Sequence, residues 1–151
     1  MRILVVSFSV NGAMGDNFFL LTRFFSKEHE VFVVTNKNIG YELLGTKNIC
    51  NIPFDFINPL SYYCIYKYVH SLDFDVCFIH SPHPVNRFIY RIVDHKKIIS
   101  FVHDHILHSG VRQLDAYLLK AQYKDYFKYS AKIIVSCHFM KNDILRLGLI
   151  K

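Results

Sequence analysis

The stretch DVCFIHSPHPVNRFIYRIVDHKKIISFVH, residues 75–103, decides the fold of this 151-residue chain. It holds two short, almost continuously apolar runs, 75–80 and 97–103, with a segment at 84–94 between them that begins with a proline. Near-continuous apolarity is typical of parallel strands that are covered on both faces. Proline is favoured in the first turn of a helix. The stretch therefore predicts a strand–helix–strand unit with two parallel strands.

The same alternation runs through the rest of the chain. The other expected strands are short β-branched runs at 2–8, 30–35, 46–52 and 132–137. The other expected helices show apolar periodicity at 16–27, 59–71, 113–129 and 138–147. We therefore predict an α/β fold of the Rossmann-like type: a doubly wound parallel sheet in strand order 3-2-1-4-5-6, with helices on both faces, in one domain over 1–151.

The first predicted helix, 16–27, has a capping residue and an apolar face. Asp16 is the expected N-cap. Phe19, Leu20 and Phe24 fall on one side of the helix, with Leu21 beside them, and are expected to face the sheet.

Composition and charge narrow the class of protein. The chain is 52% apolar and 20% charged, as globular proteins are. A net charge of +6 favours acidic partners, but the basic residues form no long block, so we expect no nucleic-acid partner. The four cysteines lack zinc-type spacing, and no run has the length of a membrane span or the form of a secretory leader. We expect a cytoplasmic location.

Histidines gather after the predicted strands. Six of the nine lie at the end of a predicted strand or in the segment that follows it: His80, His83, His103, His105, His108 and His138. Ligands of open parallel sheets bind beyond the carboxyl ends of the strands, where the strand order reverses. The histidines therefore predict a ligand crevice at this edge, to which Ser81 and Ser136 also belong.

Three interpretations are open for His103, His105 and His108. They could be imidazole ligands of a catalytic metal, although Asp104 is the only carboxylate near them in sequence and strand alternation turns it away. Alternatively, His103 could bond to the backbone at the strand end, with the other two in solvent. Finally, the rings could contact a ligand directly and hold its hydroxyls or phosphates. We adopt the last interpretation and predict no metal.

The turn SVNGAMG, residues 9–15, opens onto the same edge. Asn11, Gly12 and Gly15 allow a tight turn whose backbone N–H groups, with the helix that follows, offer an anion site. Equally, the turn could be a plain connection that binds nothing, with glycines only because its backbone dihedral angles require them. The turn is not GxGxxG, and no acidic residue follows the second strand, so an NAD site is not expected.

The order of these segments resembles GT-B glycosyltransferases of the GT4 type. The opening strand ILVVSFS, the turn GAMG and the segment KEHEVFVVT match the start of that family, although Glu28 replaces the usual glycine before His29. IISFVHDH, residues 98–105, resembles the family's fifth strand, whose terminal His-Asp pair matches His103 and Asp104. In YSAKIIVSCHFMKNDILRLGL, Ser136 and Gly148 match the end of a strand and of the next helix.

The resemblance implies the acceptor-binding, amino-terminal half of a hexosyltransferase, with the carboxy-terminal donor-binding domain absent from 1–151. It implies a catalytic position for His103 and Asp104. The substrate-binding candidates at the edge are Asn11, Gly12, Gly15, His80, Ser81, His83, His105 and Ser136. It implies no cofactor beyond the nucleotide-sugar, which is the donor substrate of the complete enzyme.

The implied partners are a sugar or lipid-linked acceptor and a donor-binding domain or subunit, in synthesis of cell-surface polysaccharide or glycolipid. The isolated chain is expected to be inactive.

An alternative is a non-catalytic subunit that docks on an anionic membrane, at its inner face, and pairs with a separate donor-binding chain. Basic residues and aromatic rings recur at helical spacing: Lys120, Lys124 and Lys128 beside Tyr123, Tyr126 and Tyr129, and Arg87 and Arg91 beside Phe88 and Tyr90. Tyrosine next to basic groups suits the headgroup region of a bilayer. An ordinary solvated face over a packed core explains the same pattern.

Overall fold

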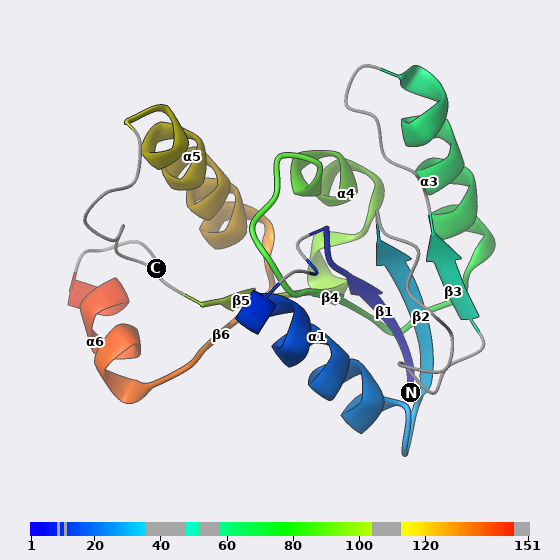
Figure 1. The fold of residues 1–151 in the computed structure, drawn as a ribbon, viewed down its shortest axis with the longest axis horizontal. Helices are drawn as coiled ribbons and strands as arrows, with labels where there is room; N and C mark the ends of the chain where they lie inside the picture. The colour runs from blue at the N-terminus through cyan, green and yellow to red at the C-terminus, as the bar shows by residue number, and fades with distance from the viewer. Residues whose placement is uncertain (9, 11, 36–47, 52–57, 104–112, 147–151) are drawn as a thin grey trace.

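A computed structural model describes residues 1–8, 10, 12–35, 48–51, 58–103 and 113–146, with side chains described outside 48–51 and 113–120. Within these residues, six strands form one sheet in the order β3-β2-β1-β4-β5-β6 (Figure 1). The strands are β1 (Arg2–Val6), β2 (Glu30–Thr35), β3 (Asn48–Asn51), β4 (Val76–Ile79), β5 (Ile98–Val102) and β6 (Lys132–Val135). Each neighbouring pair is parallel, so the predicted fold class and strand order are confirmed.

Helices connect the strands. They are α1 (Gly12–Phe25), α3 (Pro59–Ser71), α4 (Asn86–Ile92), the short 3-10 helix η1 (His95–Lys97), α5 (Gln113–Tyr129) and α6 (His138–Arg146). Pro59 begins α3 as expected, and the Asn58 side chain caps it by accepting from the Leu60 amide at 3.0 Å. Among the described residues, none of the helices is long and apolar enough to cross a bilayer.

Successive residues of β1, β2, β4 and β5 enter opposite cores. In β1, Leu4 and Val6 pack on the side of α3, α4 and α5, whereas Ile3 and Val5 pack on the side of α1. Strands β2, β4 and β5 repeat this division. Because both faces are covered, the near-continuous apolar runs in the sequence are explained.

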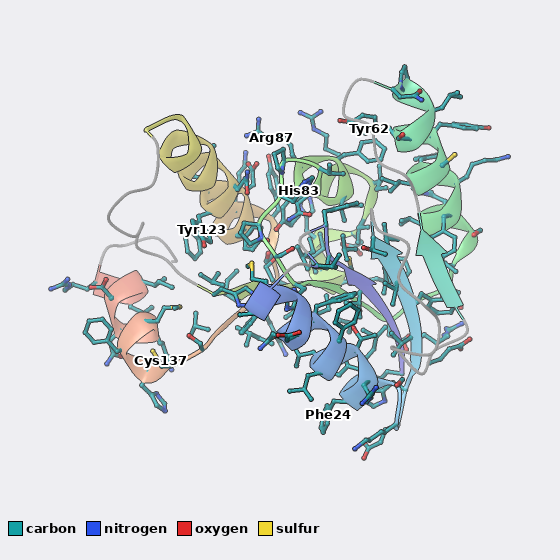
Figure 2. All side chains as sticks on the ribbon, viewed as in Figure 1. Phe24, Tyr62, His83, Arg87, Tyr123 and Cys137 are labelled. Carbon is teal, nitrogen blue, oxygen red and sulfur yellow. The ribbon has the colours of Figure 1, made fainter. Side chains whose placement is uncertain are left out.

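Helix α1 differs from the sequence prediction in its start and its buried face. It begins at Gly12, so Asp16 lies exposed inside the helix and does not cap it. Its buried residues are Gly15, Phe18 and Thr22, while Leu20 and Phe24 are exposed by 69% and 64%. Figure 2 labels Phe24 on α1. Gly15 decides this phase: a Cβ at this position would lie 2.5 Å from the Val10 carbonyl oxygen, so only glycine allows this contact with the chain.

Candidate functional site

Polar side chains meet where β1, β4 and β5 end. The Ser7 amide donates to the Val34 carbonyl at 3.1 Å, and the His80 amide donates to the Val6 carbonyl at 3.0 Å. These bonds extend the sheet by one residue beyond β1 and β4. Ser7, His80, Ser81 and His103 therefore occupy one edge, which we call the carboxyl-end site.

His80 is held at both ring nitrogens. Its Nε2 lies 3.1 Å from Oδ1 of Asn17 in α1, and its Nδ1 lies 3.3 Å from the Ser7 hydroxyl. An amide oxygen can only accept, so Nε2–H donates to Asn17 and Nδ1 accepts from Ser7. The Ser7 oxygen is also 3.2 Å from the Ser81 hydroxyl. The site thus contains a directed chain of bonds from Ser81 through Ser7 and His80 to Asn17.

His80 remains neutral at physiological pH. It is fully buried, and burial, with a smaller contribution from His103, lowers the pKa of His80 to about 3. Its ring also lies against Phe18, with centroids 5.6 Å apart. An imidazole that is neutral and hydrogen-bonded at both ring nitrogens does not gain or lose a proton near pH 7. His80 therefore positions its neighbours.

His103 follows β5 and is half-buried. Its Nε2 donates to the His80 carbonyl at 3.0 Å, and its ring packs 4.3 Å from Phe101 and 4.8 Å from His80. This is the strand-end bond to the backbone that one of the three interpretations anticipated. It fixes the proton on Nε2 and the orientation of the ring, and such a fixed imidazole can also contact a ligand.

His83 lies farther along the connection from β4 to α4. Its ring packs against Phe8 at 5.0 Å, and its Nδ1 accepts from the Val85 amide at 3.4 Å. Burial lowers the pKa of His83 to about 4, so it is also neutral near pH 7.

The other predicted site residues divide into three groups. Gly12, with a φ of +57°, starts α1, and Gly15 lies inside that helix against Val10. Ser136 is exposed between β6 and α6, in another hollow with Cys137 and Lys141. Asn11, Asp104 and His105 lie outside the described residues, as does His108. Among the described residues, no group of three His, Cys, Asp or Glu could hold a metal.

Sequence reasoning missed several polar residues of this region. Ser7 directly follows β1, so the strand-end rule that found His80 could have found it too. Asn86 in α4 donates to the Ser81 carbonyl at 2.7 Å and to the Tyr126 hydroxyl at 3.1 Å. Tyr126 is 40 residues away in sequence, so no local pattern connects the two.

The aromatic residues proposed to meet a membrane lie in the core. Tyr126 and Tyr90 are exposed by 0% and 1%, and Phe88 is partly buried against the same core. The prediction that Tyr126 and Tyr90 face lipid headgroups is therefore wrong. Their rings pack between α4, α5 and the sheet because that is the apolar side of both helices. Lys124 and Lys128 are exposed, and Arg87 pairs with Asp125 at 2.9 Å.

The strand order defines a Rossmann-like α/β domain. Residues 17–151 match the Glycosyltransferase Family 4 profile, and the chain belongs to this family. It is a glycosyltransferase-type domain that resembles the amino-terminal half of GT-B enzymes.

Several solved structures are similar to this chain at low identity. They include a Bacillus thuringiensis protein assigned as an NADPH:quinone reductase (15% identity, TM-score 0.48, covering 94% of this chain and 38% of that one). Vibrio vulnificus CurA in complex with NADPH is also similar (13% identity, TM-score 0.49, covering 99% of this chain and 47% of that one). So is the CurK enoyl reductase (13% identity, TM-score 0.43, covering 98% of this chain and 39% of that one). The chain spans less than half the length of each. A comparison with curated protein sequences gave no match.

Proposed function

We propose that this domain forms the acceptor side of a hexosyltransferase. The match of residues 17–151 to Glycosyltransferase Family 4 carries the proposal. In the reaction, an acceptor hydroxyl oxygen bonds to the anomeric carbon of the donor sugar. The bond from that carbon to the diphosphate breaks, the nucleotide leaves with the electron pair, and the acceptor proton is released. The donor is a nucleotide-sugar held by a donor-binding domain or subunit.

The contribution of this chain would be positioning. At its carboxyl-end site, Ser81, Ser7, His80 and Asn17 form a chain of hydrogen bonds with defined donor and acceptor directions, and such preorganisation lowers a barrier by orienting the reactants. His103 is the residue that we place beside the transferred sugar. Its ring is half-buried at the end of β5, and its bond to the His80 carbonyl gives it one orientation. Ser7 and Asn17 fix the His80 ring, and that ring packs against the His103 ring at 4.8 Å and supports its orientation.

The acceptor would be a sugar or a lipid-linked sugar, and the product a cell-surface polysaccharide or glycolipid. The exposed Lys124 and Lys128 are compatible with an acceptor in an anionic membrane, because each basic group near such a surface attracts it. With Tyr126 in the core, the attraction of α5 to lipid would come from its exposed lysines and would be sensitive to salt.

The test is turnover of a nucleotide-sugar by this chain together with its donor-binding domain, followed as nucleoside diphosphate release with sugar acceptors. We expect His103→Ala to lower kcat by about tenfold or more, because an oriented contact in the transition state is lost. The matched control is His70→Ala, which removes an exposed imidazole on α3. Unchanged turnover in folded His103→Ala would contradict the placement of His103. Absence of sugar transfer in the wild-type assembly would contradict the function.

A further inference from the structure

Helix α1 is apolar on more of its circumference than its own sheet covers. Large apolar side chains occur on every side of it: Phe18, Phe19, Leu20, Leu21, Phe24 and Phe25. Four of these pack into the core beneath the helix, but Leu20 and Phe24 are exposed by 69% and 64%. Figure 2 shows Phe24 on the outer side of α1. A helix that is apolar all round is typically buried on both sides, so the outer face of α1 is a candidate interface.

The exposed residues of α1 form one stripe. They recur at intervals of three and four, so they lie on the same side of the helix. Lys27 lies in the turn after α1 and continues the stripe, because its amide donates to the Phe24 carbonyl at 3.3 Å. We call this surface the α1 stripe; its members are Asp16, Leu20, Arg23, Phe24 and Lys27.

The stripe carries both a projecting ring and a hollow. The hollow has a volume of about 350 Å³, and Leu20, Leu21 and Phe24 are among the residues that line it, with Arg23 and Lys27 at the same place. A single water needs roughly 10–15 Å³, so the hollow has room for an aromatic side chain. A surface that presents a ring and a hollow side by side is complementary to itself. Two-fold dimers require this property, because the same patch meets itself across the axis.

The charges of the stripe fit an antiparallel pair of copies. Asp16 lies toward the amino-terminal end of α1, whereas Arg23 and Lys27 lie toward the carboxy-terminal end. Antiparallel helices place the acid of each copy opposite the basic end of the other. The spacing agrees: the midpoint between positions 20 and 24 nearly coincides with the midpoint between 16 and 27. An anionic bilayer would attract the basic end but repel Asp16, so a second copy fits the stripe better.

We propose that the α1 stripe is the interface of a homodimer. Two copies pair their α1 helices antiparallel about a two-fold axis, with Leu20 of each copy against Phe24 of the other. Asp16 of each copy then meets Lys27 of the other, and each Phe24 ring enters the hollow of the second copy. An interface of one helix per copy is small, so the dimer is weak, with a Kd of about 10–100 μM. This inference does not depend on the proposed function.

The experiment is sedimentation equilibrium of the 151-residue chain, from about tenfold below to about tenfold above that Kd. We expect the average mass to rise from 17.8 kDa toward twice that value. Phe24→Ser should raise the Kd by about tenfold or more, because a buried ring is lost on both sides of the axis. The matched control is Leu60→Ser, which removes a leucine of 67% exposure from α3 and should dimerise like the wild type. Both variants change exposed side chains, so the monomer keeps its fold.

Charge exchange tests the antiparallel arrangement. Asp16→Lys and Lys27→Asp should each raise the Kd by about threefold, since like charges then meet across the axis. The two substitutions in one chain should restore dimerisation, because opposite charges face each other again. A constant mass over the whole range overturns the proposal, as does equal weakening by Leu60→Ser, or a double variant that is not restored. Binding of a monomeric chain to anionic phosphatidylglycerol vesicles, lost in Phe24→Ser, would assign the stripe to lipid and also overturn it.

Discussion

His103 donates from Nε2 to the backbone carbonyl of His80 at 3.0 Å, and the two imidazole rings meet edge to face at 4.8 Å. The bond ties the residue after β5 to the residue after β4. Because His80 is itself bonded to Ser7 and Asn17, three strands and α1 are joined at one point. The site is therefore rigid at the place where an open parallel sheet receives its ligands.

The first prediction concerns acid stability. His80 has a pKa of about 3 in the folded chain and an ordinary value of 6.5. Between these values the unfolded chain binds the proton and the folded chain does not, so stability is fully present above about pH 6.5 and is lost as pH falls toward 3. From pH 7 to 5 the free energy of unfolding should drop by about 2 kcal/mol on account of this ring.

The measurement is urea unfolding across that pH range. His80→Gln should be less stable at pH 7 but show a shallower loss on acidification, because the group that takes up the proton is gone. His83 contributes in the same direction, since burial lowers its pKa to about 4. The exposed His70→Gln is the control and should keep the wild-type slope. An unchanged slope in His80→Gln would show that the His80 ring takes up its proton equally in the folded and the unfolded chain.

The second prediction concerns the two glycines of the first connection. Gly15→Ala places a Cβ 2.5 Å from the Val10 carbonyl oxygen and must move backbone, so it should lower the free energy of unfolding by about 1–3 kcal/mol. Gly12→Ala meets no atom within 4 Å but adopts a φ of +57°, and should cost about 1 kcal/mol. Denaturant unfolding of both variants measures the difference. The reverse order would mean that helix packing is looser than the structure indicates.

The third prediction tests the phase of α1. Phe18 is fully buried, so Phe18→Ala should cost about 3–5 kcal/mol. Leu20→Ser and Phe24→Ser alter exposed side chains and should each change stability by less than about 0.5 kcal/mol. Thermal or urea unfolding separates these cases. A large loss in Phe24→Ser would favour the helical face expected from the sequence pattern.

The strand–helix alternation and the strand order were predictable because burial on both faces makes each strand apolar along its length. Leu4 and Ile3 are both buried, though in different cores. The phase of α1 was not predictable from apolar spacing, because the buried face consists of Gly15, Phe18 and Thr22, of which only Phe18 is a large apolar residue, and this leaves Leu20 and Phe24 outside.

The carboxyl-end site was predictable in part for the same reason. His80 and Ser81 follow a strand, and the strand-end rule placed them at the edge. The contact between Asn86 and Tyr126 was beyond such rules, because the two residues lie on different helices and are 40 positions apart in sequence. Tyr126 shows the same limit: its lysine neighbours suggested a surface, but only the fold places its ring at 0% exposure.

The last prediction concerns the nucleotide-sugar. Four groups at the carboxyl-end site are neutral: His80 has a pKa of about 3, and Ser7, Ser81 and Asn17 carry no charge. A diphosphate carries at least two negative charges and is bound in proteins chiefly by cations and backbone amides. The nearby Arg87 is engaged with Asp125. We therefore expect the 151-residue chain alone to bind nucleotide-sugars weakly and to show no turnover.

Calorimetric titration with nucleotide-sugars and an assay of nucleoside diphosphate release provide the measurements. Adding the donor-binding domain or subunit should raise nucleotide-sugar affinity, because that partner would supply the diphosphate site. Arg87→Gln should leave the weak binding of the isolated chain unchanged, since its guanidinium already has a carboxylate partner. Submicromolar affinity of the isolated chain would contradict the assignment of this domain to the acceptor side. If that affinity were then lost in Arg87→Gln, the diphosphate would bind beside α4, and this domain would hold the donor.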